Sequence, residues 1–258
     1  LFLSCSIKAQ ILSDITLDLN SGGEVYDVAF DDSRNLYIIV GDFTSVQGQP
    51  RKNLAILDGT TLQCTNEAPI TSMNGVIRTI EFAKFQNQSQ YTRYLYIGGS
   101  FTSINGVSSQ RTYMARLRYT SGIINSTSYT VSSWDMSNNF ENWGNGGFYG
   151  INDLLLKSDT LVAVGEFSFY NDVPYYESQY LASFKIEMGG NALSQFQENL
   201  FSNHPWSASN PCYNLTMGHW SIRSIRNEFY ITGYAKFDAN GNPTGCIQYC
   251  GNERRFHD

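Results

Sequence analysis

The chain has 258 residues, of which 16% are charged and 14% aromatic, and its formal net charge is -6. This composition is typical of a folded protein rather than a disordered one, and the length is sufficient for one large all-β domain. The acidic balance leaves no basic stripe for nucleic acid or an anionic membrane. No run of 18 apolar residues predicts a membrane-spanning helix.

The first ten residues alternate between apolar and polar side chains, which predicts a half-buried β-strand. The alternative is the end of a secretory signal peptide with Ala9 at the cleavage site. As a strand, residues 1–10 form an extension of the main domain, which we expect to span residues 11–258. The residues on the more apolar side of this strand are Leu1, Leu3, Cys5 and Ile7.

Four copies of one short pattern follow, at intervals of 58 to 68 residues. In each copy an apolar, strand-like run ends in a glycine, and in the first three copies a phenylalanine stands two positions after this glycine. In the fourth copy Ala235 takes the place of the phenylalanine. The runs are LYIIVGDF, LYIGGSF, LVAVGEF and FYITGYA, and their glycines are Gly41, Gly99, Gly165 and Gly233.

Each copy lies between two further strand-like runs, and a polar turn joins the first run to the second. The preceding runs are residues 25–30, 76–82, 149–156 and 220–225. The following runs are residues 54–57, 114–117, 181–184 and 246–249. A more polar fourth run, such as residues 130–134, comes after three of them.

Four antiparallel strands per unit, repeated four times, predict an all-β fold, a β-propeller of four blades. Period-two patterning without helical spacing excludes a helical solenoid. We expect the repeated glycine to allow a close approach of the backbone and the phenylalanine to fill the space between blades. Residues 11–19 also alternate in strand fashion, and we expect them to close the ring as the outer strand of the fourth blade.

The repeat consists of a strand that ends in Gly-Gly-x-Phe-Thr, a loop with glycine, and then Ala-x-Leu. This pattern resembles the propeller repeats of large extracellular or cell-surface proteins. The propellers of the fungal cortical cell-polarity markers are the familiar example. The resemblance covers most of residues 25–250 and implies a domain used for structure and binding far more than for catalysis.

Five cysteines without a CxxC pair favour an oxidising, extracellular compartment over a structural zinc site. Among the three pairings of four cysteines, we prefer Cys212–Cys246 with Cys64–Cys250. The remaining cysteine, in the N-terminal strand, is then left for a bond to a partner chain. Three glycosylation sequons agree with secretion, although chance supplies about as many in a chain so rich in Asn, Ser and Thr. Their asparagines are Asn87, Asn125 and Asn214.

The sequence contains no Gly-x-Ser-x-Gly, Walker, His-Glu-x-x-His or dinucleotide fingerprint, and its three histidines have no metal-ligand spacing. Asp42 and Glu166 follow the repeat glycine, but we interpret them as solvent-facing strand ends rather than as an acid pair. Residues 31–35 and 238–242 place oxygen ligands at alternate positions without completing a calcium loop, and we interpret them as Asx-rich turns. We therefore expect no enzyme activity, no cofactor and no metal.

The N-terminal extension provides the favoured functional hypothesis. An apolar strand without a place in its own ring is expected to pair with an exposed blade edge of the next copy. A head-to-tail contact that does not close builds a filament. We therefore predict a secreted, non-enzymatic subunit of a fibre or surface coat, whose partners are copies of itself. The alternative at this point is that residues 1–9 fold over their own domain.

The alternative function is an extracellular binding domain for carbohydrate or protein. Three loop segments carry aromatic residues beside Asn and Asp, a combination that suits sugar stacking as well as protein contacts. Composition does not separate these two ligands. The aromatic residues selected for this hypothesis are Trp143, Tyr175, Tyr176 and Trp206.

Overall fold

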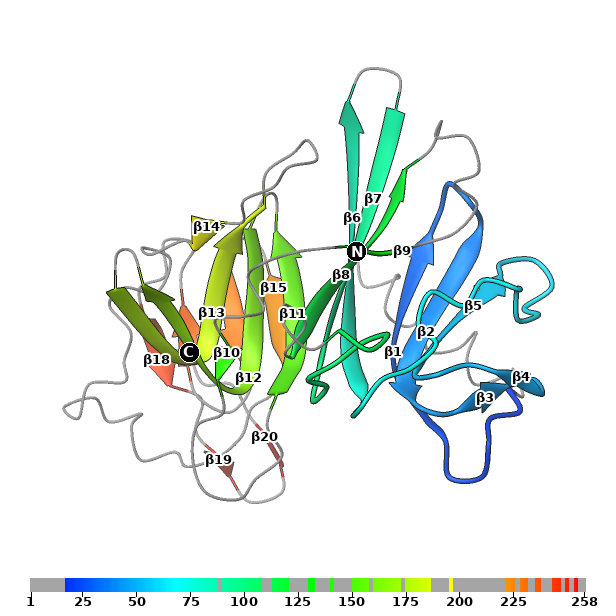
Figure 1. The fold of residues 1–258 in the computed structure, drawn as a ribbon. Helices are drawn as coiled ribbons and strands as arrows, with labels where there is room; N and C mark the ends of the chain where they lie inside the picture. Colours follow the sequence, from blue (N-terminus) through cyan, green and yellow to red (C-terminus); the bar gives the residue numbers. More distant parts are fainter. Residues whose placement is uncertain are drawn as a thin grey trace.

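In a computed structural model the described part of the chain is all β, and every strand pairing in it is antiparallel (Figure 1). It contains four sheets of three to five strands and two short two-stranded ribbons. No helix among the described residues is long and apolar enough to cross a membrane. The described residues are 17–87, 90–107, 113–120, 130–132, 140–141, 150–157, 160–172, 175–186, 195–196, 221–225, 228–231, 235–237, 243–246, 249–250 and 253–254.

The first two sheets follow the strand order predicted from the repeats, although the first has three of the four strands expected. The first sheet has the order β1-β2-β5, and the second has the order β6-β7-β8-β9. The first sheet consists of β1 (Glu24–Asp31), β2 (Leu36–Asp42) and β5 (Leu54–Asp58), with the ribbon β3 (Ser45–Val46) and β4 (Gln49–Pro50) beside it. The second consists of β6 (Ile77–Asn87), β7 (Gln90–Gly99), β8 (Met114–Thr120) and β9 (Thr130–Ser132).

The third sheet also keeps the predicted order, with one additional short strand. β10 and β11 both pair with β12, which continues through β13 to β14. Its strands are β10 (Phe140–Glu141), β11 (Gly150–Lys157), β12 (Thr160–Asp172), β13 (Tyr175–Lys185) and β14 (Gln195–Phe196). The fourth sheet has β15 (Ile222–Ile225), β16 (Glu228–Ile231), β17 (Ala235–Phe237) and β18 (Pro243–Cys246), and the ribbon β19 (Tyr249–Cys250) and β20 (Glu253–Arg254) follows it.

The fourth sheet differs from the prediction in its third strand. We expected one strand through Ala235 and a third strand at residues 246–249, whereas β17 begins at Ala235 and is itself the third strand. The Asx-rich residues 238–242 lie between β17 and β18, which pair as a hairpin, with Ala235 opposite Cys246. The segment predicted as one strand through Ala235 is therefore divided between β16 and β17.

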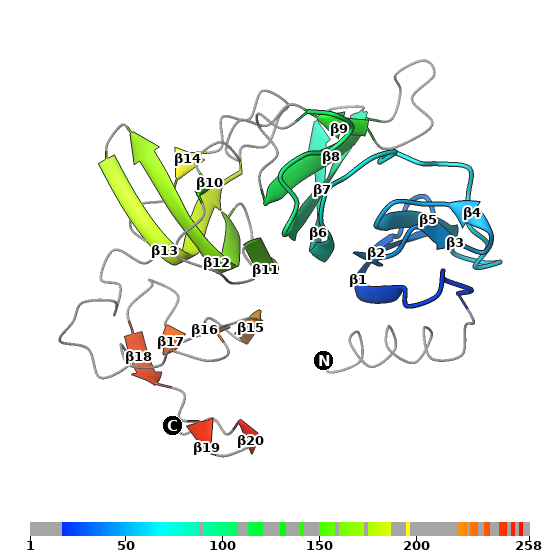
Figure 2. The ribbon, with the colours of Figure 1, turned by 60° about the horizontal axis from the view of Figure 1, so that its bottom comes forward.

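The four sheets follow one another along an open arc (Figure 2). Their first strands are neighbours in chain order, because β1 lies against β6, β6 against β11, and β11 against β15. The first and fourth sheets stand at the two ends of this arc, and the described part of the chain forms no closed ring. This arrangement places the four first strands along the inner side of the arc.

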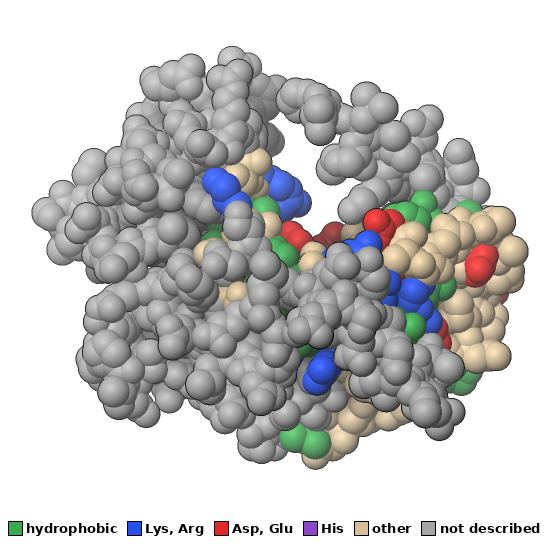
Figure 3. All heavy atoms as spheres, turned by 90° about the horizontal axis from the view of Figure 1, so that it is seen from above, with side chains coloured by type: hydrophobic (Ala, Val, Ile, Leu, Met, Phe, Trp, Pro, Cys, Tyr) green, Lys and Arg blue, Asp and Glu red, His purple; other side chains and the backbone are tan. Residues whose placement is uncertain are grey.

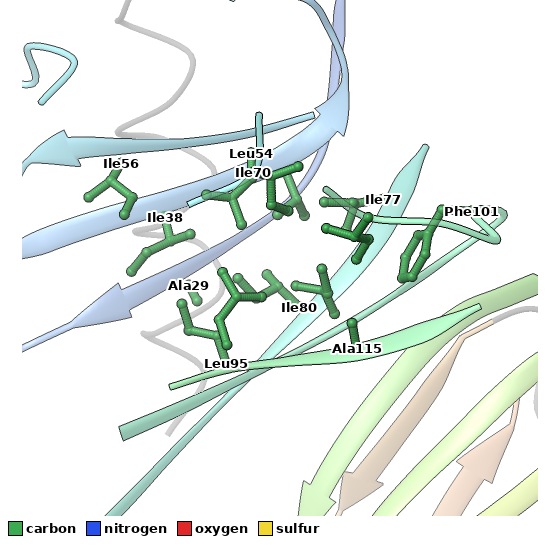
Figure 4. Packing of buried hydrophobic residues seen from close by; sticks show 14 of the residues in the cluster. Ala29, Ile38, Leu54, Ile56, Ile70, Ile77, Ile80, Leu95, Phe101 and Ala115 are labelled. Carbon is green, nitrogen blue, oxygen red and sulfur yellow. The ribbon is translucent and has the colours of Figure 1, made fainter. Parts of the chain in front are cut away.

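The core fills the spaces between successive sheets. Phe101 belongs to a buried cluster between the first and second sheets (Figure 4), and Phe167 belongs to one between the second and third. The expected role of the repeated phenylalanine is confirmed for these two copies. Burying such a side chain contributes roughly 2 to 3 kcal/mol.

Phe43, the phenylalanine of the first copy, lies on the other face of the first sheet, away from the cluster that contains Phe101. Phe43 packs there with Ile39 and Leu57, and Leu17 and Leu19 lie against the same cluster. Leu19 also forms an isolated antiparallel bridge with Val46. Of the predicted closing strand, residues 11–19, the part that the structure describes therefore lies against the first sheet, and residues 11–16 fall outside the described part.

The repeated glycine has a direct steric cause. A Cβ atom at Gly41, Gly99 or Gly165 would collide with a backbone carbonyl oxygen of the neighbouring first strand. At this level each first strand contains a β-bulge, between Val25 and Asp27 in β1 and at the equivalent places in β6 and β11. The glycine therefore accommodates a bulge, which bends the strand and redirects its side chains.

Candidate functional site

Directly after each bulge, one polar side chain occupies the same place in successive sheets. Asp27, Thr79 and Asp153 each pair with the residue that precedes the repeat glycine of their sheet. Ser221 precedes β15 and takes this place in the fourth sheet. We call these four residues, Asp27, Thr79, Asp153 and Ser221, the central belt.

Hydrogen bonds connect the belt residues from sheet to sheet. Thr79 Oγ1 lies 3.3 Å from Asp27 Oδ2 and 3.2 Å from Asp153 Oδ1. The Ser221 hydroxyl donates to Asp153 Oδ2 over 2.7 Å. Acids and hydroxyls therefore alternate along the belt. Two carboxylates that face each other directly raise the pKa of one of them. The alternation places a hydroxyl between them instead.

Backbone amides of the next sheet reinforce the belt with a repeated bond. The N–H of Ile80 donates to Asp27 over 3.0 Å, that of Leu154 to Thr79 Oγ1 over 3.2 Å, and that of Ile222 to Asp153 over 2.9 Å. Each donor stands one residue after the belt residue of its own sheet. The same contact thus recurs at three successive interfaces, as expected for copies of one unit.

A cavity of about 380 Å³ lies beside the belt, among β1, β6, β11 and Arg223. Asp27, Glu81 and Asp153 contribute carboxylates to its wall. The side chain of Arg223 is 63% exposed, and its Nη1 donates to Asp153 Oδ2 over 2.7 Å. Figure 3 views the molecule from above and shows acidic and basic side chains at the edge of a hollow.

Burial and crowding perturb two of these carboxyl groups. Burial, and after it the charges of Asp27 and Asp153, raises the pKa of Glu81 to about 7, although the backbone of Leu156 and the charge of Arg223 favour its ionised form. Burial also raises the pKa of Asp27, against hydrogen bonds from backbone N–H groups. The cavity therefore holds an acid that titrates near neutral pH.

The chemical capacity of this site is limited in the part of the chain that the structure describes. No group of three or more His, Cys, Asp or Glu residues there could hold a metal ion. The hydroxyls of Thr79 and Ser221 face carboxylates within the belt. All three histidines of the sequence fall outside the described residues. The arrangement is suited to joining sheets and to binding protons.

The cysteines predicted to form disulfides are described only in part. Cys64 is a buried free thiol, without the predicted bond to Cys250, and it pairs by an isolated bridge with Leu57 at the outer edge of the first sheet. Burial raises the pKa of the Cys64 thiol, with Arg51 opposing the shift. Cys212 lies outside the described residues, and Cys246 and Cys250 are described only in their backbones, in β18 and β19.

The aromatic residues of the predicted loops are not brought together in the described structure. Tyr175 and Tyr176 belong to the hairpin of β12 and β13, opposite Asp172 and Asn171, rather than to a loop. The difference arises because the pairing of β12 with β13 extends as far as Asp172 and Tyr175. Trp143 and Trp206 lie outside the described residues.

Most residues of the assembly and glycosylation predictions also fall outside the described part. These are Leu1, Leu3, Cys5, Ile7, Asn125 and Asn214, whereas Asn87 is the last residue of β6. Asp31 confirms the predicted Asx turn at residues 31–35, because it is buried and accepts hydrogen bonds from the backbone and hydroxyl of Ser33. Residues 238–242 lie outside the described part.

The sequence does contain a signal for the belt residues, although the alternation of the first strands does not reveal it. Alignment of the first strands on the repeat glycines places the pairs DV, TI, DL and SI at one level. A short polar residue followed by a β-branched or branched apolar one thus recurs in all four copies. The signal is two residues long, and it becomes visible only once the bulge is counted.

No protein-family model, curated protein or solved structure matches this chain. The functional conclusion therefore depends on the geometry of the belt and the cavity and on the repeated sequence pattern.

Proposed function

We propose that the chain is a four-bladed β-propeller that serves as a non-enzymatic structural domain outside the cell. The sequential contact of the four first strands supports this architecture. The belt supports a ring of four sheets, because a ring in which acids and hydroxyls strictly alternate must contain an even number of sheets. In a four-membered ring, Ser221 comes next to Asp27, which restores the alternation.

The observation that carries the non-enzymatic proposal is the use of the belt side chains. Asp153 accepts hydrogen bonds from Ser221, Ile222 and Arg223 of the fourth sheet, and Asp27 accepts one from Ile80 of the second sheet. Carboxylates engaged in this way hold one sheet to the next. A catalytic acid or base instead needs its proton-transfer atom within reach of a substrate.

Self-assembly through residues 1–9 is part of the same proposal. The alternating pattern of Leu1, Leu3 and Ile7 suits addition to a sheet edge of a neighbouring copy. Cys5 is then placed to form a disulfide with that copy. Such a contact is head-to-tail and yields a fibre or coat when it does not close.

Electrophoresis of the full chain, purified under oxidising conditions, tests the assembly. We expect a ladder of multiples of 29.0 kDa without reductant, which collapses to one band with reductant. Cys5→Ser should abolish the ladder but keep non-covalent polymers in sedimentation, and deletion of residues 1–9 should abolish both. Cys212→Ser is the matched control. A monomeric wild-type chain in both assays would overturn self-assembly.

A further inference from the structure

The bulges of the first three sheets insert one residue each, namely Tyr26 in β1, Arg78 in β6 and Asn152 in β11. The repeat glycine and the short polar belt residue next to the bulge recur from copy to copy, because both are needed to form and join the sheets. The inserted residues differ completely in chemistry. Since the fold imposes no common side chain at this position, the inserted side chains are free to bind a ligand.

The inserted residues gather at one end of the inner strands. Arg78 Nη1 donates to Asn152 Oδ1 over 2.5 Å, which links the second sheet to the third. Tyr26 is 45% exposed, and its pKa is raised by partial burial, by a hydrogen bond with Glu24 and by the charges of Glu24 and Asp42, while Arg78 opposes the shift. We call Glu24, Tyr26, Asp42, Arg78 and Asn152 the mouth cluster.

The mouth cluster contains one aromatic ring together with hydrogen-bond donors and hydrogen-bond acceptors. Glu24 and Asp42 stand opposite each other on β1 and β2, and both are exposed. Carboxylates accept hydrogen bonds, guanidinium donates them, and an amide does both. The ring of Tyr26 adds an apolar face with a polar edge.

We propose that the mouth cluster binds a neutral carbohydrate. The C–H face of a sugar ring packs on Tyr26, and its neighbouring hydroxyls meet acceptors at Glu24 and Asp42 and a donor at Asn152. The two carboxylates disfavour an anionic ligand. A protein interface core is depleted in charge and rich in apolar anchors, whereas Tyr26 is the only large exposed hydrophobic residue described at this end.

Titration calorimetry of the full chain with neutral hexasaccharides of glucose, mannose and N-acetylglucosamine tests the proposal. We expect at least one of them to bind, Tyr26→Ala to weaken that binding at least tenfold, and Tyr26→Phe to retain it within about threefold, because the ring face remains. Asn152→Ala should weaken it severalfold. Val107→Ala, at the other exposed large hydrophobic residue described, is the control and should change nothing.

Three results would overturn the proposal. They are the absence of binding of all three sugars at millimolar concentration, binding that Tyr26→Ala leaves unchanged, and tighter binding of a hexauronate than of any neutral sugar. Thermal unfolding of each variant, measured alongside, separates loss of the ligand site from loss of the fold. None of these outcomes depends on whether residues 1–9 assemble the chain.

Discussion

The acid in the cavity makes the stability of this fold depend on pH near neutrality. The pKa of Glu81 is raised from 4.5 to about 7 in the folded state, mainly by burial and by the charges of Asp27 and Asp153. The folded chain therefore holds this proton more tightly than the unfolded chain. The contribution is fully present below about pH 4.5 and is lost as the pH rises through 7.

The shift sets the size of the effect. One pKa unit corresponds to about 1.4 kcal/mol, so the loss between pH 4.5 and pH 8 amounts to at most roughly 3 kcal/mol of unfolding free energy. Glu81→Gln keeps the shape and a hydrogen-bond acceptor without the charge. This variant should match the wild type near pH 5 and exceed it at pH 8 by up to about 3 kcal/mol.

Urea unfolding followed by tryptophan fluorescence at pH 5, 6, 7 and 8 provides the measurement. The raised pKa of Asp27 acts in the same direction, so Glu81→Gln should keep a smaller decline, concentrated at lower pH. Glu24→Gln removes an exposed carboxylate and serves as the matched control. A wild-type stability that is flat or rising from pH 5 to 8, or an unchanged slope in Glu81→Gln, would refute the reasoning.

Two further substitutions test the belt and the repeat glycine by the same unfolding assay. Thr79→Val removes the hydroxyl that lies between the carboxylates of Asp27 and Asp153 and should cost about 2 to 3 kcal/mol. Thr79→Ser should restore most of this loss, and an equal loss in Thr79→Ser would speak against a hydrogen-bonding role. Gly99→Ala should cost at least about 2 kcal/mol, since its Cβ meets the carbonyl of Val76, and a neutral result would remove the steric explanation of the repeat.

The three main strands of each of the first three sheets were predictable because their causes are local. Alternating apolar residues and short polar turns identify β1, β2, β6, β7, β11 and β12, and the glycine follows from a collision within one hairpin. The phenylalanine pattern indicated packing between sheets in the same way. In these parts, the order of the strands follows from residues within one unit of the repeat.

The belt, the cavity and the fourth sheet were not predictable by that reasoning. Thr79 meets Asp27 and Asp153 at separations of 52 and 74 residues, so their contacts depend on how whole sheets pack. The raised pKa of Glu81 has the same origin. In the fourth sheet the phenylalanine is replaced by Ala235, and without this marker the division into β16 and β17 was missed.

The central claim is that the inner strands of four sheets belong to one closed belt. A crystal structure of the full chain measures this directly, at the distance between Ser221 Oγ and the backbone nitrogen of Val28. If the belt is closed, the N–H of Val28 donates a hydrogen bond of about 3 Å to Ser221 Oγ. This would be the fourth occurrence of the bond that the N–H groups of Ile80, Leu154 and Ile222 make to the preceding sheet. A fifth sheet between these two residues, or a fourth sheet packed away from β1, would contradict it.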